Sequence, residues 1–185
     1  PTFSVNGFRL GVGLSEPPQI MVAALRPRML ALAGREADGA ILNWLSPDDC
    51  ATVVPYVRDQ NPEATIACRI FVVVHQPDET AAVMPRLKQM VAAYLNVPVY
   101  REFHRWLGRE KALGEMWDAW ARGDRKGAVA AIPDEVVDEI FIHGTADECH
   151  AGIRRYIENG VDIPVLAPFH GGAELRPLLT ALAPR

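Results

Sequence analysis

The sequence has little of what marks several large classes of protein. Its 185 residues include only three cysteines, at positions 50, 68 and 149, with no C-x-x-C pair. This pattern is typical of reduced thiols rather than of a disulfide framework or a zinc ribbon. No apolar run approaches the ~20 residues of a membrane-spanning helix, and no signal-peptide pattern opens the chain. Basic residues are scattered, and the formal charge is −4, which gives no electrostatic footprint for nucleic acid. We therefore expect a cytoplasmic protein that binds neither a membrane nor nucleic acid.

The composition is that of an ordinary globular protein. Hydrophobic residues make up 49% of the chain and charged residues 23%, which argues against disorder, and the length suits one domain with a substantial core. No Gly-rich phosphate loop of the GxGxxG or GxxxxGK type occurs in the sequence. No Ser/His/Asp or Cys/His set with defensible spacing is present either. The sequence therefore points neither to a nucleotide-binding Rossmann sheet nor to a nucleophilic enzyme.

The most informative stretch runs from Gln19 to Leu45. A short apolar run over 20–25 is followed by Arg26-Pro27, and proline suits the first turn of a helix. Apolar residues then recur at helical spacing as far as Glu36, and a second apolar run begins at Gly39. Two strands separated by a helix of this length form a parallel β–α–β unit. Because neither strand alternates polar with apolar residues, we expect both to be buried.

The rest of the chain continues the alternation of strand and helix. With the two strands near 20–25 and 40–44, further apolar strands near 65–74 and 163–167 give a predicted total of four. Helices are predicted over 47–60, 77–95, 99–122 (two short ones), 126–132, 133–140, 144–159 and 173–182. Pro55 and Pro85 are expected to bend, kink or split their helices. Asn6-Gly7 predicts a small β-hairpin over 3–10.

Four buried parallel strands without a phosphate loop favour half of a (β/α)8 barrel over an open Rossmann sheet. The predicted fold class is therefore α/β of the TIM-barrel type. Alone, such a half-barrel would expose two sheet edges and the inner face that the opposite strands cover.

The stretch PPQIMVAALRPRMLALAGREADGAILNWL resembles the second-half signature of the luciferase-like monooxygenase family, whose members are (β/α)8 flavin and deazaflavin enzymes. In that family, the pattern P-x-I-x-x-A-A-x-x-P-x-M-x-x-L-A-G-x-x-A-D-G joins strand five to strand six. The segment HGTADECHAGIRRYIENGVDIPVL resembles the family's last helix and strand. The resemblance implies that residues 1–185 form the C-terminal half of one barrel domain, about strands 5–8 with their helices. It also implies coenzyme F420, a deazaflavin hydride carrier, as the cofactor, with FMN as the alternative.

The resemblance further implies which residues hold the cofactor. In the family, the turn after strand five contacts the cofactor phosphate through backbone N–H groups, and the matching positions here are Ala24, Leu25 and Arg26. A strand end that leads into a helix N-terminus offers free N–H groups independently of the resemblance. Arg26 replaces the glycine that commonly precedes the proline, and its side chain would either strengthen phosphate binding or block close backbone approach. Asn43 and Trp44, at the end of the next strand, are expected to face the same mouth.

Other polar residues leave alternatives open. Arg69 lies inside an apolar strand, so it either points into the barrel toward a carboxylate or an anionic ligand, or reaches solvent. Asp38 is expected to cap the turn before Gly39. The only metal-like cluster, His143, Cys149 and His150, lacks a fourth ligand at standard spacing, so no metal is predicted.

Three hypotheses about function follow. The first is an F420-dependent oxidoreductase that moves a hydride between the cofactor and a small organic substrate. The second keeps the fold but uses FMN and oxygen, as a monooxygenase. The third is a non-catalytic half-barrel that folds by pairing with another chain. The family's catalytic residues lie mainly in its first four β/α units, so none is assigned here. A homo-oligomer, or pairing with the N-terminal half of a barrel, is expected because the inner strand faces must be covered.

Overall fold

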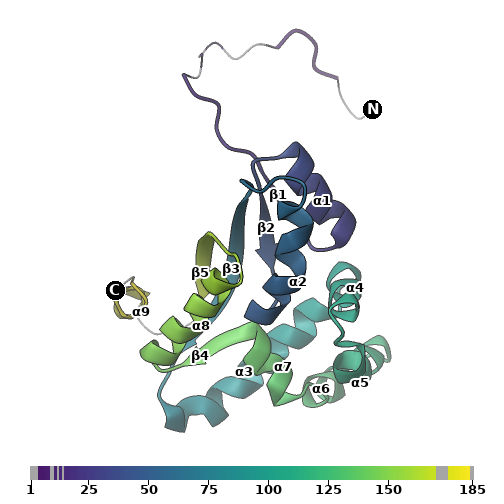
Figure 1. The fold of residues 1–185 in the computed structure, drawn as a ribbon. Coiled ribbons are helices and arrows are strands. Elements are labelled where there is room, and N and C mark those ends of the chain that lie inside the picture. The colour runs from purple at the N-terminus through teal and green to yellow at the C-terminus, as the bar shows by residue number, and fades with distance from the viewer. Residues whose placement is uncertain (1–3, 9–10, 12, 14, 170–174, 184–185) are drawn as a thin grey trace.

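The computed structural model describes residues 4–8, 11, 13, 15–169 and 175–183. They form a parallel β-sheet with helices on its faces (Figure 1). In chain order the elements are β1 (Met21–Ala23), α1 (Pro27–Glu36), β2 (Gly39–Asn43), α2 (Pro47–Arg58), β3 (Thr65–Val74), the 3-10 turn η1 (Pro77–Glu79), α3 (Thr80–Leu95), α4 (Pro98–Trp106), α5 (Glu110–Ala121), α6 (Arg125–Ala130), α7 (Asp134–Ile140), β4 (Phe141–Gly144), α8 (Ala146–Glu158), β5 (Ile163–Pro168) and α9 (Leu175–Ala181).

Strand β3 is the centre of the sheet. Its first half, 65–69, pairs with β2, its second half, 71–74, pairs with β4, and residues 67–72 pair with β5, all in parallel. Because 67–69 pair with both β2 and β5, those two strands lie on opposite sides of β3. Strand β1 pairs with β2 and forms an edge. The carboxyl ends of all these strands therefore point the same way, which is where parallel α/β proteins place their ligand sites.

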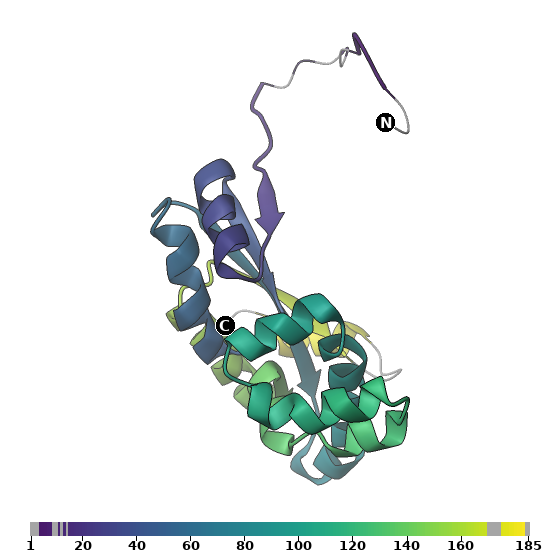
Figure 2. The same ribbon diagram turned by 90° about the vertical axis from the view of Figure 1, so that its right-hand side faces the viewer.

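One face of the sheet is buried under helices α1, α2 and α8, which lie side by side in front of it (Figure 1). The side chains of Leu42, Ile66, Cys68 and Ile70 on this face are fully buried. Helices α3 to α7 form a second group over the carboxyl half of β3 and over β4, away from α1 (Figure 2). The two groups cover different parts of the sheet and leave the remaining part open.

The open part is the other face of β1, β2, β5 and the first half of β3. The strand register aligns Ala23, Ile41, Ala67 and Ile163 in one row on this face. Ile41 is 39% exposed and Ile163 46% exposed, and Val165 in the next row is 47% exposed. These apolar side chains belong to the face that strands of a complete barrel would cover. Strand β1 was predicted to be buried, but it is only half-buried because nothing described covers this face.

Asp38 and Gly39 explain the A-D-G part of the sequence pattern. The backbone N–H of Ile20 donates to Asp38 Oδ2 at 2.7 Å, so the carboxylate fixes the start of β1 against the start of β2. A Cβ atom on Gly39 would overlap the carbonyl oxygen of Thr65 on β3. Asp38 was expected to cap the turn before Gly39, but its carboxylate instead accepts from Ile20, 18 residues earlier. Glycine is required beside it for close strand pairing.

The structure departs from the predicted elements at several points. The sequence predicted four strands and missed β4, because Phe141–Gly144 has only four residues and directly follows α7 without a break. Its strand conformation depends on pairing with 71–74, a contact that local propensity cannot show. Pro55 and Pro85 lie inside single helices and split neither of them. Of the hairpin predicted over 3–10, residues 4–8 form no strand, and the remaining residues lie outside the described residues.

Candidate functional site

The carboxyl ends of β1 and β2 open into a cavity of about 340 Å³. All four residues predicted to bind a cofactor lie in its wall, together with residues of β3 and α4. The lining residues are Ala23, Ala24, Leu25, Arg26, Met29, Ile41, Asn43, Arg69, Val99 and Tyr100. The structure therefore brings together Ala24, Leu25, Arg26 and Asn43, which the sequence places up to 19 positions apart.

The turn from β1 into α1 presents unpaired backbone N–H groups to this cavity. Ala24 continues the sheet through its N–H, which donates to the Ile41 carbonyl at 3.2 Å. The N–H groups of Leu25 and Arg26 have no hydrogen-bond partner among the described residues. Arg26 is the N-cap of α1 without a side-chain cap, and the first turn holds no acidic residue. A helix start of this kind favours a bound anion.

Two guanidinium groups add positive charge to the same cavity. Neither Arg26 nor Arg69 has a carboxylate partner in the described part of the chain, and no Asp or Glu lines the cavity. The Arg69 side chain points away from the face that α1, α2 and α8 cover. Its guanidinium carbon lies 4.7 Å from the centre of the Phe71 ring. Of the alternatives open for Arg69, the structure excludes a carboxylate partner among the described residues and shows an exposed side chain at the cavity wall.

Asn43 lines the cavity, and its two amide atoms differ in their hydrogen bonding. Its Nδ2 donates to the hydroxyl of Tyr100 at 3.3 Å, whereas its Oδ1 is buried and has no partner in the described part of the chain. A buried amide oxygen without a donor is costly, and the hydrogen bond from Nδ2 to Tyr100 holds the amide in this position. Tyr100 was not predicted as a site residue. Its only sequence signal was its place in an aromatic-rich segment that suited either core or lid.

The residue after Asn43 holds a strained backbone conformation. Trp44 has a φ of 57°, the only positive value of a non-glycine residue in the described ranges, and such a conformation costs about 1–3 kcal/mol. Its indole is fully buried, with ring centres 4.3 Å from Phe71, 4.8 Å from Tyr94 and 5.9 Å from Phe141. The prediction that Trp44 faces the mouth is therefore wrong, because its ring packs among these aromatic rings and does not line the cavity.

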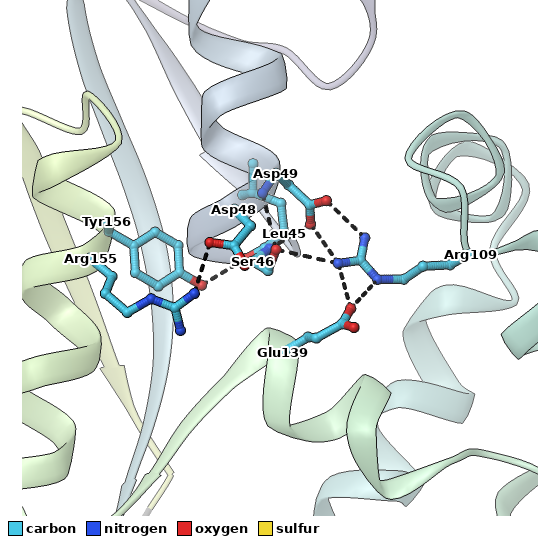
Figure 3. Close-up of polar contacts among 8 residues, drawn as sticks. All are labelled: Leu45, Ser46, Asp48, Asp49, Arg109, Glu139, Arg155 and Tyr156. Atoms are coloured by element: carbon cyan, nitrogen blue, oxygen red, sulfur yellow. Dashed lines mark hydrogen bonds and ion pairs between the residues drawn. The ribbon is translucent and has the colours of Figure 1, made fainter.

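A buried ionic network fixes the start of α2 immediately behind Trp44 (Figure 3). Ser46 and Asp49 form a reciprocal capping box. Arg109, at the start of α5, donates to Asp49 Oδ1 at 3.0 Å, to Ser46 Oγ at 3.3 Å and to Glu139 Oε2 of α7 at 2.8 Å. Burial lowers the pKa of Arg109, but Asp49 and Glu139 outweigh burial and raise it overall. Arg109 therefore stays charged and ties three helices to the end of β2.

Helix α8 holds the same turn from the other side (Figure 3). The Tyr156 hydroxyl donates to the Leu45 carbonyl at 2.7 Å, and burial raises the pKa of Tyr156 well above its ordinary value, so the hydroxyl keeps its proton. Arg155 pairs with Asp48 at 2.8 Å. The turn 44–46 is thus fixed by groups from several distant elements.

A separate polar cluster lies at the ends of β3 and β4. His75 Nε2 lies 3.1 Å from His143 Nδ1, and His143 Nε2 lies 2.8 Å from Asp138 Oδ1. The other members of the metal-like cluster point elsewhere, since the Cys149 thiol contacts the Val73 carbonyl and His150 contacts the Ala181 carbonyl. Burial raises the pKa of Cys149 to about 11. No group of three metal-ligating side chains occurs among the described residues.

Fold and cavity together define a class of protein: a parallel α/β sheet, shaped as part of a barrel, with an anion-attracting cavity at its carboxyl edge. The chain belongs to the luciferase-like monooxygenase family, whose model matches residues 3–162. The family resemblance and the predicted α/β fold are thereby confirmed. No helix in the described ranges is long and apolar enough to cross a membrane.

Individual relatives are reductases and dehydrogenases. The chain is 28% identical over 154 residues to 5,10-methylenetetrahydromethanopterin reductase of Methanolobus tindarius, covering 77% of this chain and 45% of that protein. The coenzyme F420 dependent tetrahydromethanopterin reductase of Methanopyrus kandleri has a similar structure, with a TM-score of 0.62 and 21% identity, covering 83% of this chain and 45% of that one. An F420-dependent secondary alcohol dehydrogenase in complex with an F420-acetone adduct gives a TM-score of 0.64 and 16% identity, covering 98% of this chain and 54% of that one. The chain spans about half the length of these relatives.

Proposed function

We propose that this protein is an F420-dependent oxidoreductase, in which a hydride moves between the deazaflavin and a small organic substrate. The observation that carries the proposal is the cavity at the start of α1, where free backbone N–H groups and two unpaired arginines converge. The family assignment and the F420-dependent relatives support the same cofactor.

In this proposal, the residues of the cavity bind and orient the cofactor. The N–H groups of Leu25 and Arg26 and the guanidinium groups of Arg26 and Arg69 hold the cofactor phosphate, because charge-assisted hydrogen bonds to an anion are the strong ones. Asn43, held by Tyr100, forms part of the wall against which the cofactor lies. Bound F420 supplies the chemistry as a hydride donor or acceptor. The residues assigned here bind the cofactor, and no catalytic residue is assigned in this chain.

FMN remains the competing cofactor, because it also carries a phosphate and would use the same N–H groups. The relatives named above favour F420, whereas the family name is shared with flavin monooxygenases. A cofactor-free half-barrel that only pairs with another chain is disfavoured, because similar structures are those of F420-dependent enzymes.

The open sheet face belongs to the same proposal. In the working enzyme, we expect further β/α units or a second chain to cover Ile41, Ile163 and Val165, which turns the cavity wall into one side of a closed barrel. A cytoplasmic location is part of the proposal, because all three cysteines are free thiols buried in the core.

Fluorescence titration of the natural full-length protein with F420 tests the proposal. Arg26→Met and Arg69→Met are each expected to weaken binding about 10- to 100-fold, the loss of one hydrogen-bonded charge at an anion. Arg154→Met is the control, because this arginine is exposed on α8, far along the chain from the cavity residues. Equal affinities of all three variants and the unmodified protein would place the phosphate elsewhere.

A further inference from the structure

The inference concerns how the cavity keeps its shape, and it rests on the proposed function. Asn43 is the last residue of β2, and the direction of its amide depends on the turn that follows. That turn begins with Trp44 in the left-handed region, where a tryptophan has no intrinsic preference to remain. Some other part of the molecule must hold the turn in place.

Arg109 connects this turn to helices α5 and α7. It is 8% exposed, and its guanidinium bonds Ser46 and Asp49 on one side and Glu139 on the other (Figure 3). Ser46 lies two residues after Trp44 and is itself 3% exposed. The planar fork of arginine suits several acceptors at once, and lysine has no equivalent geometry.

The contacts of Arg109 do not reach the cavity. Arg109 does not line the cavity wall, whereas Asn43 and Tyr100 do. The chain leads from Ser46, which Arg109 bonds, through Leu45 and Trp44 to Asn43 in the cavity wall, and this is the route by which the Arg109 side chain can affect a bound ligand. This distinguishes Arg109 from Arg26 and Arg69, which face the ligand directly.

We propose that Arg109 is a positioning residue for the cofactor site. By holding Ser46 and Asp49 at the start of α2, it keeps the strained Trp44 turn in place and keeps Asn43, with its hydrogen bond to Tyr100, in the cavity wall. There the Asn43–Tyr100 pair lies against the bound cofactor. Glu139, which fixes the far side of the guanidinium, is part of the same device.

A double-mutant cycle tests this in the natural full-length protein, with F420 fluorescence as the readout. Asn43→Ala and Arg109→Met are each expected to weaken F420 binding about tenfold. If Arg109 acts through Asn43, the double variant is also expected to lose about tenfold rather than about a hundredfold. Arg105→Met is the matched control, because its partners Glu102 and Glu110 are exposed and it is expected to leave affinity unchanged.

Glu139→Gln covers the case in which Arg109→Met fails to fold, because Arg109 keeps its bond to Asp49 in that variant. Glu139→Gln alone is expected to weaken F420 binding a few-fold. Added to Asn43→Ala, it is expected to weaken binding no further than Asn43→Ala does by itself. If, in either cycle, the loss of F420 affinity in the double variant equalled the product of the two single losses, this inference would be overturned and the proposed function would stand. Absence of F420 binding by the unmodified protein would overturn the proposed function and this inference with it.

Discussion

His104 provides a test of the packing behind the cavity. It lies on α4, its side chain is fully buried, and neither ring nitrogen has a hydrogen-bond partner among the described residues. Burial, and then the positive charge of Arg109, lower the pKa of His104 to about 3 from an ordinary value of 6.5. The folded protein therefore holds this ring neutral, whereas the unfolded chain protonates it as the pH falls below 6.5.

The sign follows from linkage. Because the unfolded state binds the extra proton, His104 makes folding less favourable as the pH falls from 6.5 toward 3, at ~1.4 kcal/mol per pH unit. At about pH 5 the loss amounts to roughly 2 kcal/mol, and over the whole window it is on the order of 5 kcal/mol. Such a loss is a large fraction of the stability of an ordinary domain.

Urea unfolding at about pH 8 and about pH 5 measures the effect, with His104→Leu as the test variant. The difference in unfolding free energy between the two pH values is expected to be smaller by roughly 2 kcal/mol in the variant. At about pH 8 the variant is expected to be no less stable, because it removes buried polar atoms that have no partner. Phe103→Leu, a neighbouring core change without a titrating group, is expected to change the unfolding free energy by the same amount at both pH values. If His104→Leu kept the full pH dependence of the unmodified protein, the conclusion that His104 is neutral in the folded state would be refuted.

Three further predictions concern the sheet and the cavity. Gly39→Ala is expected to destabilise the protein by at least about 2 kcal/mol in urea unfolding, because its Cβ would overlap the Thr65 carbonyl. Gly114→Ala, in open space on α5, is expected to be neutral or stabilising, and equal effects of the two would contradict the strand register. Tyr100→Phe is expected to weaken F420 binding about 3- to 10-fold by leaving Asn43 Nδ2 without its partner, whereas Tyr94→Phe is expected to change nothing. By light scattering, the 185-residue chain alone is expected to be oligomeric or unstable because of its open apolar face, and a stable, monodisperse monomer of 20.4 kDa would count against that geometry.

Local sequence signals were enough for the β–α–β unit around α1. Pro27 at the first helical turn, the apolar spacing up to Glu36 and glycine at position 39 each have a local meaning, and the structure places α1 at 27–36 and β2 at 39–43. Four residues chosen by resemblance to the family line one cavity because they follow parallel strands whose ends meet at one edge.

What sequence reasoning missed depends on contacts between distant segments. Strand β4 is strand only because it pairs with 71–74, some 70 residues earlier. Arg109 lies 60 positions from Asp49, and no spacing rule joins them. Tyr100 was one aromatic residue among several, and only the folded position of α4 brings its hydroxyl to Asn43. These contacts complete the site, and a local pattern carries no signal for them.

A paired titration tests directly whether the cofactor of this protein is F420 or FMN. The natural full-length protein is titrated with F420 and with FMN under identical conditions, together with its Arg26→Met variant. We expect saturable F420 binding that is weakened about 10- to 100-fold in the variant, with no comparable binding of FMN. Preferential binding of FMN would contradict the deazaflavin assignment, and binding of neither cofactor would contradict the proposed function as a whole.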